Sequence, residues 1–509
     1  MDYARWCARV WRGTACREDA PLRPGTPRRG TRGRILSGVT SPTAATPSTT
    51  SSDAFLAALR SALPSLRLLI DAADTEAYRW DETEYMHPGM PLGVAFPTST
   101  ADVSTIMRLA TEHRVPVVPR GAGSGLSGGA IAVEGALTVV LTGMRSVLEI
   151  DSRNLLVVTQ PGVINADLGR AVAEHGMFYP PDPASFEICS IGGNLAENSG
   201  GLRCVKYGVT RDYVLGLEVV LADGSVIRTG GRTVKDVMGY DLTQLLVGSE
   251  GTLGIITEAT LRLLPMPPPK LTMLAFFASV PAAGEAVAGI TRDGVVPVTL
   301  ELLDRFTIRA VDSALHVGLP EDAGAMLMIE SDAGGVAAEA ELDRAGAACT
   351  AAGATEVIRA TDPQEADWLR EARRKAHWAL EQAGVARMED IGVQRSQAPE
   401  LLSTIERISG RHGVRVGVFG HAGDGNFHPT FVMERDDPDA EQRIDAVRSE
   451  LFGAVLAMGG TISGEHGTGV AKRGYLARQR GDDYVRVMRA IKTALDPLGI
   501  LNPGKVFPD

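Results

Sequence analysis

Three histidines and one glutamate near the C-terminal end of the chain have the residue types of a metal site. His421 and His428 lie in one glycine-rich stretch, and a second stretch contains Glu465 followed directly by His466. Two imidazoles and one carboxylate are suitable ligands for a divalent ion such as zinc or manganese, and three protein ligands leave coordination positions open. His466 would then serve as general base, because imidazole accepts a proton near neutral pH.

The spacing alone leaves an alternative to this metal site. H-x6-H is not a recognised zinc spacing, so His421 and His428 could instead hydrogen-bond within a glycine-rich turn. Asp424, between Gly423 and Gly425, is predicted to fix that turn rather than to bind metal.

Three arginines lie on a helix that is predicted to begin at Pro363. Arg370 and Arg374 share a face of this helix, and Arg373 lies one step around it. One of these arginines would pair bidentately with the carboxylate of a substrate if it reached the site. The alternative is an ordinary solvated charged face.

The stretch from Arg120 to Gly129 is the clearest candidate for an anion-binding loop. It contains five glycines between residues 121 and 129, and glycine adds no side chain to a core while allowing close backbone approach. A run of backbone N–H groups can hold a phosphate. Residues 123–128 also spell G-x-G-x-x-G, but that fingerprint requires a following helix, and residues 130–141 read as strands. We therefore predict a phosphate-binding loop in a strand-rich domain, without a helix dipole; a plain surface loop is the alternative.

Two further segments have compositions that suit a cofactor. Residues 189–201 combine small side chains, two glycine pairs and two asparagines, which suits contacts to a large planar polar ligand. Residues 248–256 form a glycine-rich loop that enters a strand running to Leu264.

Short strands and helices are predicted around these segments. A helix capped by Ser99 should run to His113, and a linker at 265–269 is too rich in proline to join a sheet. The other elements expected before the linker are a helix at 53–63, strands at 115–118, 147–150 and 155–159, a helix at 165–175 and a hairpin of 217–221 with 226–228.

Beyond the linker we predict an α+β layer, a sheet with helices on one side. The expected strands are 272–277, 298–302, 326–330 and 356–358, and the expected helices are 363–382, 399–409 and 439–458.

Composition limits the classes of function. The net charge of −11 argues against binding nucleic acid or an anionic membrane, and no apolar run is long enough to span a bilayer. The five cysteines do not form C-x-x-C pairs, which disfavours a bound iron–sulfur cluster and indicates a reducing, cytoplasmic location. Residues 1–52 are predicted to be disordered; a transit peptide and a misassigned start codon are the alternatives.

Six motifs occur in order between residue 90 and the C-terminus and together resemble the flavoprotein family of D-2-hydroxyacid dehydrogenases. This family includes FAD-linked D-lactate dehydrogenases, the flavin subunit of glycolate oxidase and D-2-hydroxyglutarate dehydrogenase. The motifs are residues 120–129, 189–201, 248–256, 421–428, 464–469 and Leu501-Asn502-Pro503-Gly504-Lys505.

The resemblance implies a two-part architecture of the vanillyl-alcohol-oxidase type. An N-terminal helical segment would span 53–89, an FAD domain 90–265 and a substrate-binding cap 271–509, with residues 495–509 returning to the flavin. No histidine lies in the glycine loop, which implies non-covalent FAD. The indicated cofactor-binding residues are Arg120, Gly121, Ala122, Gly123, Ser124, Gly125, Leu126, Pro183, Ser190, Gly192, Gly193, Asn194, Asn198, Gly200, Glu250, Gly254, Ile255, Ile256, Asn502 and Lys505.

The resemblance also implies roles for the residues of the second half. His421, His428 and Glu465 would bind the metal, His466 would take the hydroxyl proton while hydride leaves for flavin N5, and Lys505 would favour the reduced flavin. Arg373 would bind the substrate carboxylate. The next two substrate-side positions of the 2-hydroxyglutarate enzymes hold His377 and Met388 here, which favours D-lactate or glycolate over 2-hydroxyglutarate.

Electrons would pass to a separate acceptor, such as an iron–sulfur subunit, a quinone or a cytochrome. The chain would then be cytoplasmic, with attachment to the inner membrane through a partner and a homodimer both left open. Three alternatives remain: an oxidase that uses O2, a non-redox FAD transferase that resembles alkyl-dihydroxyacetone-phosphate synthase, and a non-catalytic flavin subunit.

Overall fold

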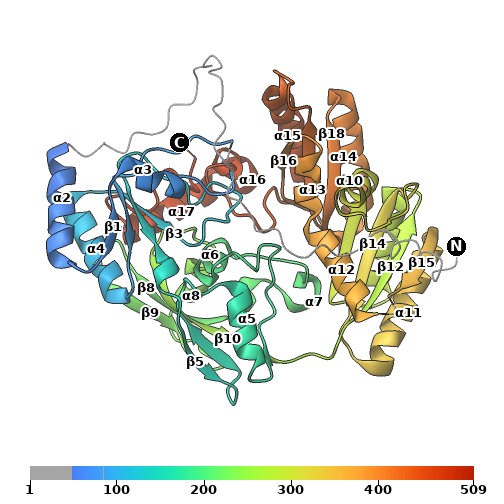
Figure 1. Cartoon of the computed structure of the whole chain (residues 1–509), viewed down its shortest axis with the longest axis horizontal. Helices are drawn as coiled ribbons and strands as arrows, with labels where there is room; N and C mark the ends of the chain where they lie inside the picture. The colour runs from blue at the N-terminus through green and yellow to red at the C-terminus, as the bar shows by residue number, and fades with distance from the viewer. Residues whose placement is uncertain (1–48, 84, 361, 509) are drawn as a thin grey trace.

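The structure is a computed structural model that describes residues 49–83, 85–360 and 362–508 (Figure 1). Most of the N-terminal extension predicted to be disordered lies outside the described residues. Helix α2 begins at Thr49, before the predicted start at Asp53, and runs to Ala62. Phe55 and Leu59 on this helix are fully buried against α4, so α2 belongs to the folded core.

A four-stranded sheet carries the glycine loop. Its order is β1-β2-β4-β3, with β2, β4 and β3 parallel and β1 antiparallel. Ser99 caps α4 as predicted, in a reciprocal capping box with Asp102. The elements of this unit are β1 (Arg67–Leu69), α3 (Ala72–Thr75), β2 (Gly93–Phe96), α4 (Thr100–His113), β3 (Val117–Arg120) and β4 (Leu137–Val140).

A second, antiparallel sheet packs beside the first and shares its core. Val220 and Ile255 from this sheet contact the cluster formed by α2, α4 and the first sheet. The sheet order is β5-β6-β10-β8-β9. The elements are β5 (Val147–Asp151), β6 (Leu156–Thr159), α5 (Asn165–Ala173), β7 (Met177–Phe178), α6 (Ile191–Glu197), α7 (Cys204–Tyr207), β8 (Val214–Val220), β9 (Val226–Gly230), α8 (Leu242–Leu246) and β10 (Ile255–Arg262).

The prediction that the proline-rich segment cannot join a sheet is wrong at its first residue. Strand β11 (Leu264–Pro265) pairs with β7, and Pro265 lies opposite Met177. Proline is tolerated there because a two-stranded pairing leaves its nitrogen on a free edge.

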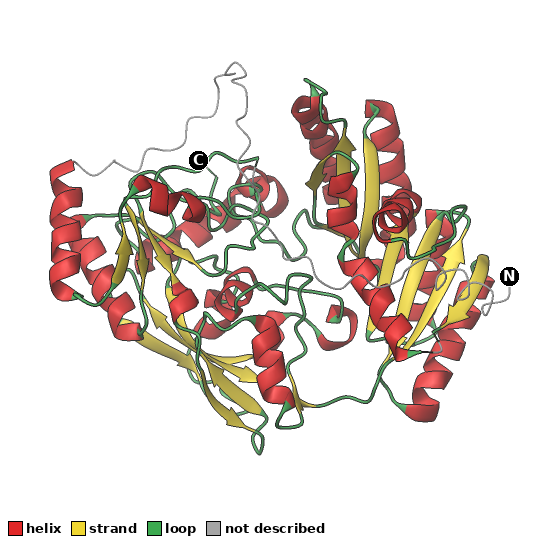
Figure 2. Cartoon of the chain, viewed as in Figure 1, coloured by secondary structure: helices red, strands yellow, loops and turns green. Residues whose placement is uncertain are grey.

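The second half of the chain forms an eight-stranded sheet, ordered β15-β12-β14-β13-β18-β19-β16, with β17 paired to β19 (Figure 2). The elements are β12 (Leu271–Phe277), α9 (Val280–Arg292), β13 (Thr299–Asp304), α10 (Arg305–Leu315), β14 (Ala325–Ser331), α11 (Gly335–Ala351), β15 (Ala354–Arg359), α12 (Pro363–Arg374), α13 (Ala376–Gln382), β16 (Val385–Met388), β17 (Ile391–Gly392), α14 (Ala398–His412), β18 (Arg415–His421), β19 (Asn426–Met433) and α15 (Ala440–Ala457).

Helices cover both faces of this sheet, so the expected one-sided layer is wrong. Leu327 and Ile329 pack against α9, α11 and α14, whereas Met326 and Met328 pack against α10, α12 and α13. Every residue of β14 is buried, because a strand covered on both faces has no solvent side. The predicted helix 363–382 is also divided in two at Lys375.

The C-terminal tail returns to the glycine loop after helices α16 (Leu476–Arg480) and α17 (Asp482–Leu495). In Figure 1 these two red helices lie among the blue and green elements. Leu501 bridges to Val117 in parallel, beyond the edge strand β3. Asp496 fixes this tail because its carboxylate accepts the N–H groups of Ile500 and Leu501.

Candidate active site

A cavity of about 330 Å³ connects the glycine loop with the loop that carries His466. Most of the predicted cofactor residues line it: Arg120, Gly121, Ala122, Gly123, Ser124, Gly125, Leu126, Pro183, Ser190, Gly192, Gly193, Asn194, Gly200, Glu250, Gly254, Ile255 and Ile256. Segments 120–126, 183–200 and 249–256 therefore meet at one site, although they are far apart in the chain.

The glycine loop presents its backbone to this cavity. Among the described residues, the N–H groups of Gly123, Ser124 and Gly125 have no hydrogen-bond partner, as a phosphate-binding nest requires. Gly123 has a φ of 85°, and a β-carbon there would lie 2.0 Å from Arg120 Nη2. The buried Arg120 side chain thus fills the space behind the loop, and only glycine fits in front of it.

Residues 189–201 contain a helix that the sequence did not predict. Ser190 caps α6, and its Oγ accepts hydrogen bonds from the N–H groups of Gly193 and, across the cavity wall, Ala122. The N-terminal end of α6 therefore lies beside the glycine loop. A pair of glycines disguised this helix, because glycine is a poor helix former.

Three predicted cofactor residues lie behind the cavity instead of lining it. Asn502 Nδ2 donates to the carbonyls of Gly129 and Glu250, and the buried Lys505 Nζ donates to those of Gly128 and Ile131. Burial lowers the pKa of Lys505 to about 7. Asn198 ends α6 and accepts a hydrogen bond from the N–H of Arg211.

The two histidines that are predicted to bind metal lie on one β-hairpin, which the sequence did not predict. His421 ends β18, and His428 on β19 pairs with Phe419. Because side chains alternate along a strand, His421, Phe419 and His428 share one face of the sheet. The H-x6-H spacing is therefore the spacing of a hairpin, with Gly425 at a φ of 85° in its turn.

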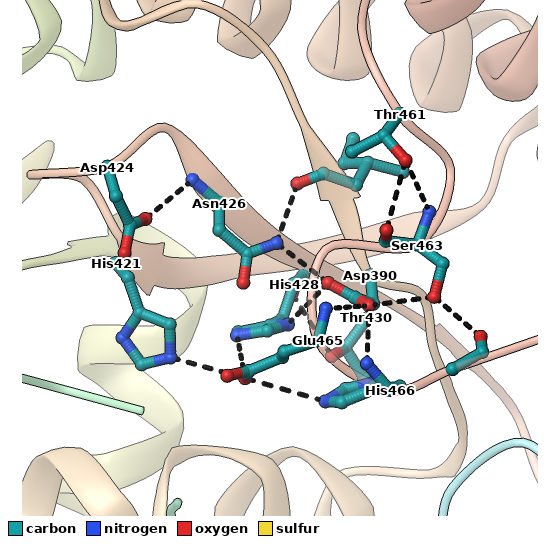
Figure 3. A network of polar contacts seen from close by, with 12 residues as sticks. Asp390, His421, Asp424, Asn426, His428, Thr430, Thr461, Ser463, Glu465 and His466 are labelled. Carbon is teal, nitrogen blue, oxygen red and sulfur yellow. Dashed lines mark hydrogen bonds and ion pairs between the residues drawn. The ribbon is translucent and has the colours of Figure 1, made fainter. Parts of the chain in front are cut away.

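Glu465 and His466 approach the hairpin from the loop of residues 464–469, as Figure 3 shows. Glu465 Oε1 lies 3.3 Å from His421 Nε2 and 3.4 Å from His428 Nε2. The three ligand atoms all lie within 4.8 Å of one another. The His466 ring stacks on His428 with centroids 5.1 Å apart, and its Nε2 lies 3.7 Å from Glu465 Oε1.

Buried acids orient this group. Glu301 on β13 accepts a hydrogen bond from His421 Nδ1 at 2.7 Å, which leaves Nε2 directed toward Glu465. Burial alone would lower the pKa of His421, but the carboxylates of Glu301 and Glu465 raise it well above its usual value. Burial holds the pKa of His428 well below its usual value, against the pull of Glu465.

Asp390 is a second orienting acid that, like Glu301, the sequence did not predict. One of its oxygens, Oδ2, accepts the backbone N–H groups of Glu465 and His466, each at 2.9 Å, and Oδ1 accepts Asn426 Nδ2 at 2.7 Å. Asp390 is fully buried, yet His466, Lys472 and His428 hold its pKa well below the usual value. A lone aspartate after a short strand gave no sequence signal for this role.

Arg373 reaches the group indirectly. It is buried, forms an ion pair with Glu301 and lies over the Phe419 ring at 4.9 Å, but it does not line the cavity. Asp424 accepts a hydrogen bond from the N–H of Asn426 within the hairpin turn. Among the described residues it belongs neither to the group of His421, His428 and Glu465 nor to a second possible metal group, Asp390, His428 and His466. Burial raises the pKa of Asp424 to about 6.

The nitrogen and oxygen atoms of this cluster fit the divalent ion that the sequence predicts. His421 Nε2, His428 Nε2 and Glu465 Oε1 converge as a divalent ion requires, and Glu301 supports His421. His428 Nδ1 has no hydrogen-bond partner among the described residues and lies 3.9 Å from Asp390 Oδ1. Gly200 joins the two regions, because a β-carbon there would lie 2.4 Å from Glu465 Oε2. The cavity wall at that point also contains Glu197 and His377, which were not predicted to bind cofactor.

Comparisons with known proteins identify both parts of the chain. Residues 91–230 match the FAD binding domain, and residues 266–506 match the C-terminal domain of FAD linked oxidases. Glycolate oxidase subunit GlcD of Bacillus subtilis is 45% identical over 84% of this chain and 92% of its own length. D-2-hydroxyglutarate dehydrogenase of Xanthomonas citri is 36% identical, with 89% of this chain and 97% of that protein covered.

Two further proteins extend the comparison. D-lactate dehydrogenase of Anaerostipes hadrus is 32% identical over 86% of this chain and 94% of its own length. The structure of p-cresol methylhydroxylase with substrate bound has the same fold, with a TM-score of 0.77 at 17% identity, and 91% of this chain and 98% of that one are covered. The chain is therefore an FAD-linked oxidoreductase and belongs to the family of FAD-linked D-2-hydroxyacid dehydrogenases.

Proposed function

We propose that this protein oxidises a small D-2-hydroxyacid to the 2-oxoacid, with D-lactate or glycolate as the favoured substrate. The observation that carries the proposal is that Glu465 and His466 line the same cavity as the glycine loop. A proton acceptor and a metal ligand therefore face the place where FAD is expected. The names of the relatives, a glycolate oxidase subunit and a D-lactate dehydrogenase, support the same substrate class.

In the proposed reaction, the cofactor, the metal ligands and His466 have separate roles. FAD, held without a covalent bond, supplies the hydride acceptor. A divalent metal held by His421, His428 and Glu465, with zinc or manganese as candidates, would lower the pKa of the substrate hydroxyl. His466 takes the hydroxyl proton, and Asp390 keeps the His466 backbone in place.

The substrate side of the cavity favours a short acid. Met388 is partly buried against the core of the eight-stranded sheet and does not line the cavity, whereas His377 does. Neither residue offers a permanent cation for the distal carboxylate of 2-hydroxyglutarate. Arg373 keeps its proposed role in binding the substrate carboxylate only if its pair with Glu301 opens.

The electrons leave for a separate acceptor, an iron–sulfur subunit, a quinone or a cytochrome. The chain has no C-x-x-C motif for a cluster of its own. No helix of the described residues is long and apolar enough to cross a bilayer. We propose a cytoplasmic enzyme that reaches the inner membrane, where it does so, through a partner; purified protein should reduce an added dye faster than O2.

An anaerobic titration tests the proposal. The purified yellow protein is mixed with D-lactate, L-lactate, glycolate and D-2-hydroxyglutarate while its visible spectrum is recorded. We expect D-lactate or glycolate to bleach the flavin band and L-lactate to leave it unchanged. Bleaching by none of these acids, with dithionite still reducing the flavin, would reject the proposed substrate class.

A further inference from the structure

Glu197 is an acidic residue in the cofactor cavity for which the mechanism above has no use. It is the last residue of α6, and it lines the cavity near the loop that carries His466. Its Oε2 is buried and has no hydrogen-bond partner among the described residues. An unpartnered carboxyl oxygen of this kind is costly unless something in the cavity pairs with it.

A second carboxyl group lies beside Glu197. A β-carbon on Gly467 would lie 1.9 Å from Glu197 Oε2 and 3.2 Å from Glu250 Oε1, so both acids flank the same glycine. They flank Gly129 as well, because a β-carbon there would lie 2.9 Å from Glu197 Oε1 and 3.7 Å from Glu250 Oε2. At Gly467, whose φ is 82°, a side chain would displace the Glu197 carboxyl group.

Both carboxyl oxygens of Glu250 already accept hydrogen bonds. Its two oxygens accept the N–H groups of Thr468 and Gly469, each at 2.7 Å, which a carboxylate does and a protonated acid does less well. Burial raises the pKa of Glu250, but the N–H groups of Thr468 and Gly469 oppose that shift, so the ionised form is better supported at Glu250 than at Glu197. Glu250 also fixes the loop that carries Glu465 and His466 against the cofactor cavity.

The buried carboxyl groups around Glu197 favour its neutral form. Two buried carboxyl groups this close do not both ionise, because like charges in a poorly solvated site repel. Burial, Glu250 and Asp81 raise the pKa of Glu197 well above its usual value, and Lys472 opposes them only in part. A protonated carboxyl has an O–H to donate, and none of the described residues accepts it.

We propose that the Glu197 side chain is a neutral hydrogen-bond donor to an acceptor atom, a carbonyl oxygen or ring nitrogen, of the bound flavin. The inference rests on FAD as the ligand of this cavity, not on the identity of the hydroxyacid. Glu250 then orients the base-bearing loop, and Glu197 contacts the cofactor. Both acids are thereby assigned, although the sequence pointed only to Glu250.

Three variants separate a donor from a charge. Glu197→Gln keeps a neutral side chain with donor N–H groups, and Glu197→Ala removes the donor. Glu187→Gln is the matched control, because Glu187 is exposed in the same segment and does not line the cavity. Each protein is purified with its flavin, stripped of FAD and titrated with FAD, and the visible spectrum of the holoprotein is recorded.

We expect Glu197→Ala to bind FAD about 10-fold more weakly, the loss of one hydrogen bond of typical strength, with shifted flavin bands. Glu197→Gln should keep the affinity within about 3-fold of the unaltered protein, with its spectrum. Unchanged affinity and spectrum in Glu197→Ala would overturn the inference, and so would equal loss in Glu197→Gln and Glu197→Ala. These outcomes stay readable if no hydroxyacid reduces the flavin, so failure of the proposed function is distinguishable.

Discussion

The two regions of the active site are built in different ways. The cofactor region consists of contiguous segments, such as residues 120–126, whose backbone N–H groups are proposed to hold FAD and whose glycines leave room for it. The histidine–carboxylate region uses side chains from a hairpin and a distant loop, held by the buried acids Glu301 and Asp390. Substitutions in the cofactor region should weaken FAD binding. Substitutions in the histidine–carboxylate region should slow the reaction while FAD stays bound.

The largest effect is expected from replacing the proton acceptor. His466→Gln should slow reduction of the flavin by the acid substrate about 10²- to 10⁴-fold, because general base catalysis is lost. FAD content should stay the same, since no glycine-loop contact depends on this ring. Anaerobic stopped-flow measures the rate, with His175→Gln, an exposed histidine after α5, as the control. Loss of FAD from His466→Gln would contradict the separation of cofactor binding from catalysis.

The cofactor region is tested by two neighbouring residues. Gly123→Val should weaken FAD binding about 10- to 100-fold, because its φ of 85° strains a branched residue and Arg120 occupies the space. Ser124→Ala should change the affinity by about twofold or less. Fluorescence titration of the apoprotein with FAD measures both, and equal losses would contradict binding through the backbone.

Asp390, which supports the loop of Glu465, can be replaced without changing the proposed metal ligands His421, His428 and Glu465. Asp390→Asn should lower metal affinity about 10- to 100-fold, because a supporting contact of Glu465 and His466 is weakened. Asp424→Asn, in the same hairpin region, should leave the metal content unchanged. Elemental analysis after dialysis measures both, and metal loss from Asp424→Asn alone would reverse these assignments.

The smallest effect concerns the stability of the eight-stranded sheet. Buried Glu330 on β14 accepts from Thr272 and Thr299, and although burial opposes ionisation, Lys270 and Arg370 lower its pKa to about 2. Its folded pKa lies below the unfolded value near 4.5, so its stabilisation is present above pH 4.5 and lost as the pH falls toward 2. Between about pH 5 and about pH 3.5 this loss is about 1 kcal/mol.

Urea unfolding at these two pH values measures that loss. The variant Glu330→Gln, which has no carboxylate to titrate, should show a smaller fall in the free energy of unfolding over the same range of pH. An equal fall in the free energy of unfolding of both proteins would show that Glu330 does not cause the loss of stability.

The same difference between the regions decided how much could be predicted from the sequence. The glycine loop, the hairpin of β8 and β9 and the helix capped by Ser99 depend on local patterns, and the structure confirms these elements. The β18–β19 hairpin was missed because its strand residues are interrupted by glycines and histidines. Helix α6 was missed for a related reason, since Gly192 and Gly193 disfavour a helix that tertiary contacts stabilise.

Residues that act through long-range contacts could not be predicted. Glu301 and Asp390 each lie in a stretch of sequence without a motif, and only the fold brings them to the site. Glu197 lies within the motif of residues 189–201, but its residue type gave no sign that it lines the cavity. The C-terminal motif predicts Lys505 and Asn502 as flavin contacts, yet both side chains donate to backbone carbonyls, those of Gly128 and Ile131 and those of Gly129 and Glu250. A motif indicates the region of a site, but the partner of each atom is decided by packing.

Removal of the metal tests most directly whether the two regions form one site. Purified protein is treated with a chelator, its visible spectrum is recorded, and D-lactate or glycolate is added without oxygen. The stripped protein should keep its yellow flavin band and resist bleaching by the acid, and added zinc or manganese should restore bleaching. Bleaching of the stripped protein at the original rate would contradict the account.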